Sequence, residues 1–533
     1  MTQLLDVFGF ISVVLRGLAL SFEALTVGGV IFVVAIAGGI VGKDVVGRAL
    51  RWLVCAATAL AITQVVLAVA NSAILIGTTD LRPAEIVGAE FWKATLLVLA
   101  GAVTIVILAG GRWYATAAVI GCLSILAGSA MMSHSAGRLE YRWLVTALTL
   151  GHHAAGGAWI GGLPYLLVAL RRTPDGGTAG RLTGRFSRLA MGSVALVMGA
   201  GAGLGIVYVG SGAALIGTTY GLMLLAKVAF TGVLLLFGIL NLKIVRAVRR
   251  GCNPSLLPLR RFAEAEVGIG FTVLLTAASL TSTPPAVDVK ADRVKGPEIV
   301  ERITPRWPRL ETPRFADLSP ATPLAIPENS TLPASFIPGE VQNHNNAADI
   351  AWSEYNHHWA GLSVLAIGTL AMFSRRLSWA RHWPLVFLGL AVFLLVRADS
   401  ENWPLGPRGF WESFQVAEVA QHRFFVLLIV LFAIFEWAVQ TQRIEARRAG
   451  LVFPLVCAVG GGLLMTHSHS LGNVREEFLA ELSHVPLALL AVSAGWCRWL
   501  EIRLPRDRAQ MVAWVWPVCL VLMGVVLILY RES

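Results

Sequence analysis

The amino-acid sequence predicts an all-α membrane protein that crosses the bilayer many times. Of its 533 residues, 56% are hydrophobic and only 14% are charged, whereas charged residues make up about a quarter of an ordinary soluble domain. Apolar stretches of about 18 residues or more, long enough to cross a bilayer as helices, recur along most of the chain. A Pro-rich segment separates them into two blocks. The predicted fold is a polytopic bundle of about 14 transmembrane helices, eight before this segment and six after it.

The predicted helices follow one another with short turns inside each block. The spans of the first block are 8–40, 51–77, 90–109, 113–132, 143–170, 188–210, 219–242 and 262–282. Those of the second block are 355–374, 383–397, 420–440, 451–466, 484–500 and 510–530. We therefore divide the chain into an eight-helix membrane domain (1–283), an exterior segment (284–350) and a six-helix membrane domain (351–533).

Basic residues orient these helices, because turns rich in Lys and Arg stay in the cytoplasm. Six turns are basic, and they alternate with turns that are neutral, acidic or mixed: 43–51, 171–188, 243–261, 375–381, 443–448 and 498–508. A single orientation places all of them inside and leaves both termini outside, which in a bacterium is the periplasm. The net charge of +11 then reflects membrane topology and gives no indication of a nucleic-acid partner.

The segment 284–350 lies outside in this orientation. It follows the last apolar run of the first block, and residues 283–350 hold 11 of the 23 prolines of the chain. Proline interrupts helices and central strands. We expect an extended linker or a small irregular exterior domain.

The sequence lacks the motifs of nucleotide-binding proteins and of common hydrolases. The stretch "AGGIVGKD" lacks the spacing and the hydroxyl residue of a phosphate-binding loop, so no nucleotide is expected. No GxSxG or HExxH pattern supports hydrolysis. The sequence therefore favours a protein that is not an enzyme.

The histidines gather on one predicted side of the membrane. Of the 11 histidines, only His382 falls at a predicted cytoplasmic turn, and the other ten lie at the outer ends of spans or in the exterior segment. Histidines that merely reach toward lipid headgroups would populate both faces similarly. This one-sided distribution indicates a function on the outer side.

Two segments carry these histidines in a similar pattern. "MMSHSAG" and "LMTHSHS" each place a Met and a small hydroxyl residue before a His at the outer end of a helix. The next histidine opens the returning helix, 18 residues after His134 and 17 after His467. The pattern is typical of a parallel internal repeat.

The ligand types point to a metal. Imidazole suits copper, zinc, iron and nickel, and thioether sulfur selects Cu(I). The sequence therefore favours copper, as Cu(I) or Cu(II), although Met packing in the core explains the thioethers equally well. The candidate metal ligands are His134, His152, His153, His467, His469, His484, Met132 and Met465, with His357, His358 and His422 as additional candidates.

Neighbouring histidines leave alternatives open. His152 and His153 are about 100° apart on a helix, so one of them is expected to face the bundle interior. The spacing match favours His152, and the choice between His357 and His358 is equally open. Glu23 and Lys227 lie inside predicted spans, where ionisable residues pair or line a path. They are candidate path residues, with a structural pair between Arg16 and Glu23 as the alternative.

The motifs resemble a known family. "HHAAGGAWIGGLPYLL" with the upstream His134, "YGLMLLAKVAF", "NLKIVRAV" and "AEAEVGIGFTVLLTAASLTSTPP" are similar to the eight-span domain of the copper resistance protein D (CopD) family, over residues 10–285. The block containing "LLMTHSHSLGNVREEFLAELSHVPLALLAVSAGWCRWLEIRLP" resembles the extension of longer members. The resemblance implies a bacterial inner-membrane protein that moves copper from periplasm toward cytoplasm, with copper-linked histidines at His134 and at His152 or His153.

Two rival functions remain on sequence grounds. A b-type haem held by two histidines, for example His134 and His484, would make the protein a membrane oxidoreductase. A copper-delivery or assembly factor would receive copper on the outer face without moving it across. The expected partners are copper, the lipid bilayer and a periplasmic copper-binding protein.

Overall fold

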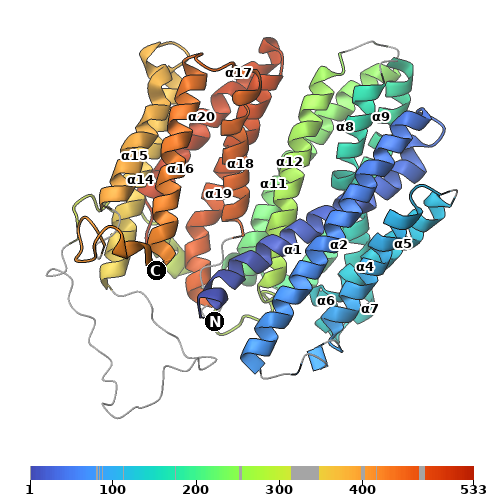
Figure 1. Ribbon diagram of the computed structural model, residues 1–533, viewed down its shortest axis with the longest axis horizontal. Helices are drawn as coiled ribbons and strands as arrows, with labels where there is room; N and C mark the ends of the chain where they lie inside the picture. The colour runs from blue at the N-terminus through green and yellow to red at the C-terminus, as the bar shows by residue number, and fades with distance from the viewer. Residues whose placement is uncertain are drawn as a thin grey trace. The chain divides into compact units, whose positions relative to one another are not determined.

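The computed structural model describes residues 2–79, 82, 85–86, 88–111, 113–173, 176–250, 252, 255–313, 347–397, 402–415, 417–466 and 474–532. Within these ranges the long elements are all helices (Figure 1), and the one β-type pairing is an isolated bridge between Asn402 and Arg408. The predicted all-α class is confirmed. The chain forms two compact units, Met1–Ala291 with Met465–Ser468, and Asp292–Leu464 with His469–Ser533.

The first unit contains the elements before residue 291. They are α1 (Thr2–Ile31), η1 (Phe32–Ala37), α2 (Lys43–Thr79), α4 (Glu90–Leu108), α5 (Tyr114–Met131), α6 (His134–Gly137), α7 (Arg142–Gly156), η2 (Gly157–Gly161), α8 (Leu163–Arg172), α9 (Gly176–Val209), α10 (Gly212–Ile216), α11 (Thr219–Arg249) and α12 (Leu257–Ser282). The elements η1 and η2 are π-helical turns, a wider coil that interrupts α-helices mostly at functional sites.

The second unit contains the remaining helices around an aromatic core that includes Trp383, Phe453 and Trp516. They are α13 (Gly296–Ile303), α14 (Ala347–Phe373), η4 (Trp379–Leu385), α15 (Val386–Arg397), η5 (Glu412–Gln415), α16 (Ala417–Gln440), α17 (Ala446–Ala449), α18 (Val452–Leu464), α19 (Val474–Arg503) and α20 (Arg506–Ile528). Helix α13 lies inside the Pro-rich segment. It forms there because its proline stands in the first turn, where no backbone N–H is needed.

Twelve helices in the described ranges are long and apolar enough to cross a bilayer. The chain is therefore a multi-pass membrane protein, as the sequence predicted. Two further predicted spans, 355–374 and 451–466, correspond to α14 and to the shorter α18, which has 13 residues. The number of fourteen spans and the three domain boundaries stay predictions.

Helix α1 packs against α2, α12 and η2. Glycines permit this close approach: a Cβ on Gly161 would lie 1.7 Å from the carbonyl oxygen of Ala24, and one on Gly157 would lie 2.8 Å from Cβ of Val27. The motif "GGAWIGG" thus brings the backbone of η2 against α1. This contact positions the side chains of the candidate site.

Candidate functional site

A buried polar cluster joins α1, α5 and α7 in the first unit. Glu23 on α1 is 5% exposed. Its Oε1 lies 3.0 Å from Nδ1 of His153 on α7, and its Oε2 accepts a hydrogen bond of 2.7 Å from the Ser129 hydroxyl on α5. The Ser129 hydroxyl also lies 3.2 Å from Nδ1 of His153. Three helices thus supply one carboxylate, one imidazole and one hydroxyl.

The geometry of this cluster fixes the orientation of the imidazole. A histidine whose Nδ1–H donates to a carboxylate presents its Nε2 lone pair on the other side of the ring, the arrangement common around metal-binding histidines. Glu23 reaches His153 because Ala24, the next residue on α1, lies against Gly161. Arg16 does not pair with Glu23; it donates to the carbonyl oxygen of Thr281 at 3.0 Å. The structural Arg16–Glu23 pair considered from the sequence is therefore wrong.

His134 begins the short helix α6, just beyond the end of α5. Its ring lies 6.0 Å from that of Tyr208 and 6.4 Å from that of Tyr220, measured between centroids. The imidazole makes a hydrogen bond to the backbone of Leu280, while its Nε2 is buried and has no hydrogen-bond partner in the described ranges. The hydroxyl of Tyr208 is likewise buried without such a partner.

The electrostatics of His134 favour its neutral form. Burial lowers its pKa below the ordinary 6.5, and the charges of Arg16 and Arg138 act in the same direction. A neutral imidazole with an unpartnered, buried Nε2 can accept a hydrogen bond or bind a soft metal ion. The residues around His134 therefore fit a metal ligand.

His152 and His153 face different neighbours. His152 Nδ1 lies 3.2 Å from the carbonyl oxygen of Val197 on α9, and its ring interacts electrostatically with Lys227 on α11. His153 belongs to the Glu23 cluster. The spacing pattern favoured His152, whereas His153 is the residue that contacts the carboxylate of Glu23. Which of the two binds a metal stays a prediction.

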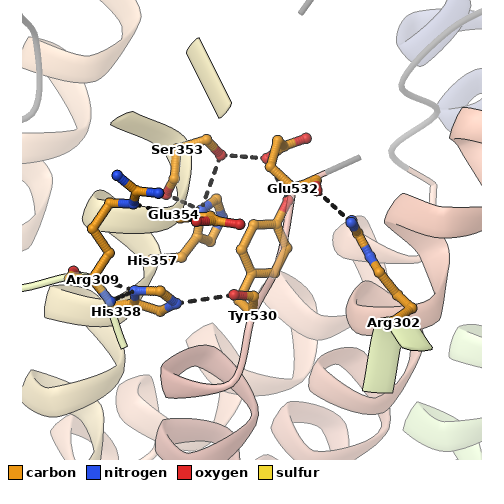
Figure 2. Close-up of polar contacts among 8 residues, drawn as sticks. All are labelled: Arg302, Arg309, Ser353, Glu354, His357, His358, Tyr530 and Glu532. Carbon is orange, nitrogen blue, oxygen red and sulfur yellow. Dashed lines mark hydrogen bonds and ion pairs between the residues drawn. The ribbon is translucent and has the colours of Figure 1, made fainter. Parts of the chain in front are cut away.

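In the second unit, His357 and His358 on α14 hold the end of the chain (Figure 2). The His357 ring stacks on Tyr530 with centroids 3.8 Å apart, and its Nδ1 lies 2.8 Å from the Ser353 carbonyl oxygen. His358 is 4% exposed. Its Nδ1 accepts a 2.7 Å hydrogen bond from the Arg309 amide, and its Nε2 lies 2.9 Å from the Tyr530 carbonyl oxygen. Both nitrogens of His358 thus have protein partners.

The remaining predicted residues are spread over the chain. His467 and His469 lie outside the described residues. Met465 is 1% exposed, and its carbonyl oxygen accepts a hydrogen bond from the Ser279 hydroxyl within the first unit. Met132 is half-buried, His422 on α16 is exposed, and His484 on α19 is buried. Among the described residues, no group of three or more His, Cys, Asp or Glu side chains is placed to hold a metal ion.

Three residues with buried polar groups were not among the predicted site residues. Ser129 and Tyr208 gave no signal, because hydroxyl residues are common in apolar helices. Glu266 on α12 did give one: a carboxylate inside an apolar span is a functional candidate by default. It is 2% exposed and accepts hydrogen bonds from the side chains of Asn241 and Trp159.

The fold and these clusters define a polytopic α-helical membrane protein with buried histidine and carboxylate groups in its first unit. Residues 180–280 match the family profile of CopD, copper resistance protein D. This match supports the resemblance to the CopD family that the motifs indicated. It is also 29% identical, over 209 residues, to the copper transport protein CutJ of Bacillus subtilis (strain 168). That alignment covers 38% of this chain and 37% of the relative. No solved structure matches the chain.

Proposed function

We propose that this protein captures copper on the periplasmic face of a bacterial inner membrane and moves it toward the cytoplasm. The family match and the name of the Bacillus relative support a role in copper transport or resistance. The alternation of basic turns supports an orientation with both termini in the periplasm. Copper is the transported substrate in this proposal and not a resident cofactor.

The observation that carries the proposal is the contact of His153 with Glu23 beside the His134 segment. Ser129, which donates to Glu23, precedes His134 by only five residues. The Cα atoms of Ser129 and His134 are therefore at most about 18 Å apart. A ligand at the outer end of α5 is thus only five residues along the chain from a side chain that contacts the carboxylate–imidazole pair.

The chemistry of these groups suits capture and release. Neutral His134 offers its Nε2 on the outer side, and Met132 lies two residues before it. In the interior, Glu23 orients the His153 ring and contributes negative charge. Several weak sites in succession let an ion both enter and leave. Lys227 interacts with His152 and lies beside this proposed path.

The other candidate ligands extend the capture site. His152, His467, His469, His484 and Met465 are proposed to bind copper during entry, and His357 and His422 stay additional candidates. His358 is the weakest candidate, because both of its ring nitrogens already contact backbone groups. A periplasmic copper-binding protein would deliver the ion. Delivery without translocation is the competing proposal, and uptake into sealed vesicles separates the two.

The test measures copper bound per chain after detergent-purified protein is loaded with Cu(I) and washed. The proposal predicts bound copper that falls in His134→Ala and in His153→Ala. His382→Ala is the matched control, because this histidine accepts a 2.8 Å hydrogen bond from the Trp437 indole at a predicted cytoplasmic turn. Copper near zero in the unmodified protein would contradict the proposal, and a Soret absorption band would then favour the haem alternative.

A further inference from the structure

A second buried carboxylate, Glu266, lies in the first unit away from the proposed copper ligands. The cavity beside it has a volume of about 250 Å³ and is bounded by α8, α9, α11, α12 and η2. Its wall is mostly apolar and includes the hydroxyl residues Thr183 and Ser187 and the amide of Asn241. Two of its lining residues, Met191 and Ile239, are 48% and 53% exposed. The carboxyl group therefore borders a space large enough for water.

Two features of the surroundings of Glu266 act on its carboxyl group in opposite directions. Burial among apolar side chains disfavours the charged form. The N–H donors of Asn241 and Trp159 favour it, because they donate to a carboxylate oxygen. Water entering the cavity shifts the balance further toward the charged form. The Oδ1 of Asn241 is buried without a hydrogen-bond partner in the described ranges, so it can accept from such a water.

Among the described residues, no other ionisable side chain lines this cavity. On α12 itself, Glu264 forms ion pairs with Arg171 of α8 and Arg261, at 3.2 and 2.6 Å. Basic residues of the packed helices make other contacts: Arg185 of α9 donates to the carbonyl oxygens of Ile36 and Gly38, and Arg16 of α1 to that of Thr281. Arg181 of α9 donates to the Thr178 hydroxyl, and Arg260 of α12 donates to the carbonyl oxygen of Leu170. The remaining charged residues on these elements are Asp6 and Glu23 of α1, Arg172 of α8, Arg188 of α9, and Lys227, Lys243, Arg246 and Arg249 of α11.

The position of the cavity in the bundle determines on which side of the membrane Glu266 would exchange protons. Leu259, Thr183 and Val245 lie close to the ends of α12, α9 and α11 that adjoin the basic turns 171–188 and 243–261. The sequence predicts these turns on the cytoplasmic side. A proton leaving Glu266 through the cavity therefore reaches the cytoplasmic end of the bundle.

The π-helical turn η2 connects the two buried carboxylates. Trp159 of η2 donates to Glu266, while Gly161 of the same turn lies against Ala24, next to Glu23. His153 stands one turn before η2 on the same helix. A cation bound at Glu23 and His153 is thus separated from Glu266 by one short element. The positive charge of such a cation favours the ionised form of the Glu266 carboxyl.

We propose that Glu266 is a proton-binding site of the transport cycle, which holds one proton when the Glu23–His153 cluster is empty and releases it when copper arrives there. The carboxyl O–H bond breaks, the proton passes to water in the cavity, and the carboxylate charge offsets one positive charge of the ion. When copper leaves, the carboxylate takes a proton back from the cytoplasmic side. This inference rests on the proposed copper function.

The test counts the protons released when Cu(I) is added to the full-length protein in a weakly buffered detergent solution with a pH indicator. Unmodified protein should release about one more proton per copper bound than Glu266→Gln. Glu264→Gln is the matched control, because it makes the same change on the same helix in a carboxylate paired with arginines. It should release as many protons as the unmodified protein.

The outcomes separate the two proposals. No copper bound by the unmodified protein would contradict the copper function, and this inference with it. Copper bound with equal proton release from Glu266→Gln and unmodified protein would overturn the inference alone. If Glu266→Gln does not fold, dicyclohexylcarbodiimide, which reacts with protonated carboxyls in apolar surroundings, replaces it. Mass spectrometry of the unmodified protein should then find Glu266 labelled without copper and less labelled with it; equal labelling would overturn the inference.

Discussion

The Nδ1 atom of His153 lies 3.0 Å from the Oε1 atom of Glu23, although 130 residues separate the two along the chain. Helix α7 can present this imidazole to α1 because the glycines of η2 remove the side chains that would hold the helices apart. In this pair Glu23 is buried and His153 is half-buried, and the Ser129 hydroxyl is the third member of the cluster. The following predictions depend on this arrangement and on its neighbours.

Removing the charge of Glu23 should weaken copper binding. In Glu23→Gln the amide keeps the size of the side chain but no longer favours the Nδ1–H tautomer of His153. Loss of an orienting carboxylate typically costs about 10–100-fold in metal affinity. A competition titration with a Cu(I) chelator measures this change. Ser129→Ala leaves the carboxylate in place and should cost less; an unchanged affinity in Glu23→Gln would show that the pair does not serve copper.

A methyl group at Gly161 should disrupt the first unit. The added Cβ would lie 1.7 Å from the backbone oxygen of Ala24, so α1 and η2 must separate. Overpacking of this kind typically costs about 1–3 kcal/mol. Thermal unfolding followed by size-exclusion chromatography should show a lowered Tm for Gly161→Ala. Gly192→Ala on α9 has no atom within 4 Å of its new Cβ and is the control; equal Tm values in the two variants would argue against the tight contact.

The pH dependence of copper binding should follow His134. Because burial lowers the pKa of this imidazole below 6.5, it is neutral at pH 7, and protons compete with copper only at lower pH. The same shift makes the folded protein lose stability as the pH falls below 6.5, where the unfolded chain binds the proton more readily. Copper titrations from pH 8 to pH 5 should therefore show constant affinity at first and a loss below pH 6.5. A loss that begins between pH 8 and pH 7 would contradict this assignment.

His358→Ala should loosen the end of the chain without removing copper. The substitution leaves the Arg309 amide and the Tyr530 carbonyl oxygen without their partner (Figure 2), and each unsatisfied buried group typically costs about 1–3 kcal/mol. Limited proteolysis should cut the variant near residue 530 faster than the unmodified protein. Copper bound per chain should stay the same. Lost copper with an intact C-terminus would instead make His358 a ligand.

The sequence predicted the helical class and the membrane character because apolar length alone determines both. The motif "HHAAGGAWIGG" and the carboxylate at position 23 also indicated two members of the buried cluster. Their pairing was not predictable, since it depends on how closely α1 approaches η2. The spacing of histidines favoured His152, whereas the contact of His153 with Glu23 depends on tertiary packing that linear spacing does not record. His358 looked like a ligand in the sequence, yet its two nitrogens bind backbone groups brought from 49 and 172 residues away.

Copper uptake into proteoliposomes tests the central claim most directly. Vesicles containing the unmodified protein should accumulate copper in time, as measured by mass spectrometry of washed vesicles. Those containing His134→Ala or His153→Ala should accumulate it at least about tenfold more slowly, and those containing His382→Ala should match the unmodified protein. Uptake no faster than in protein-free vesicles, from protein that is folded and correctly inserted, would contradict the account.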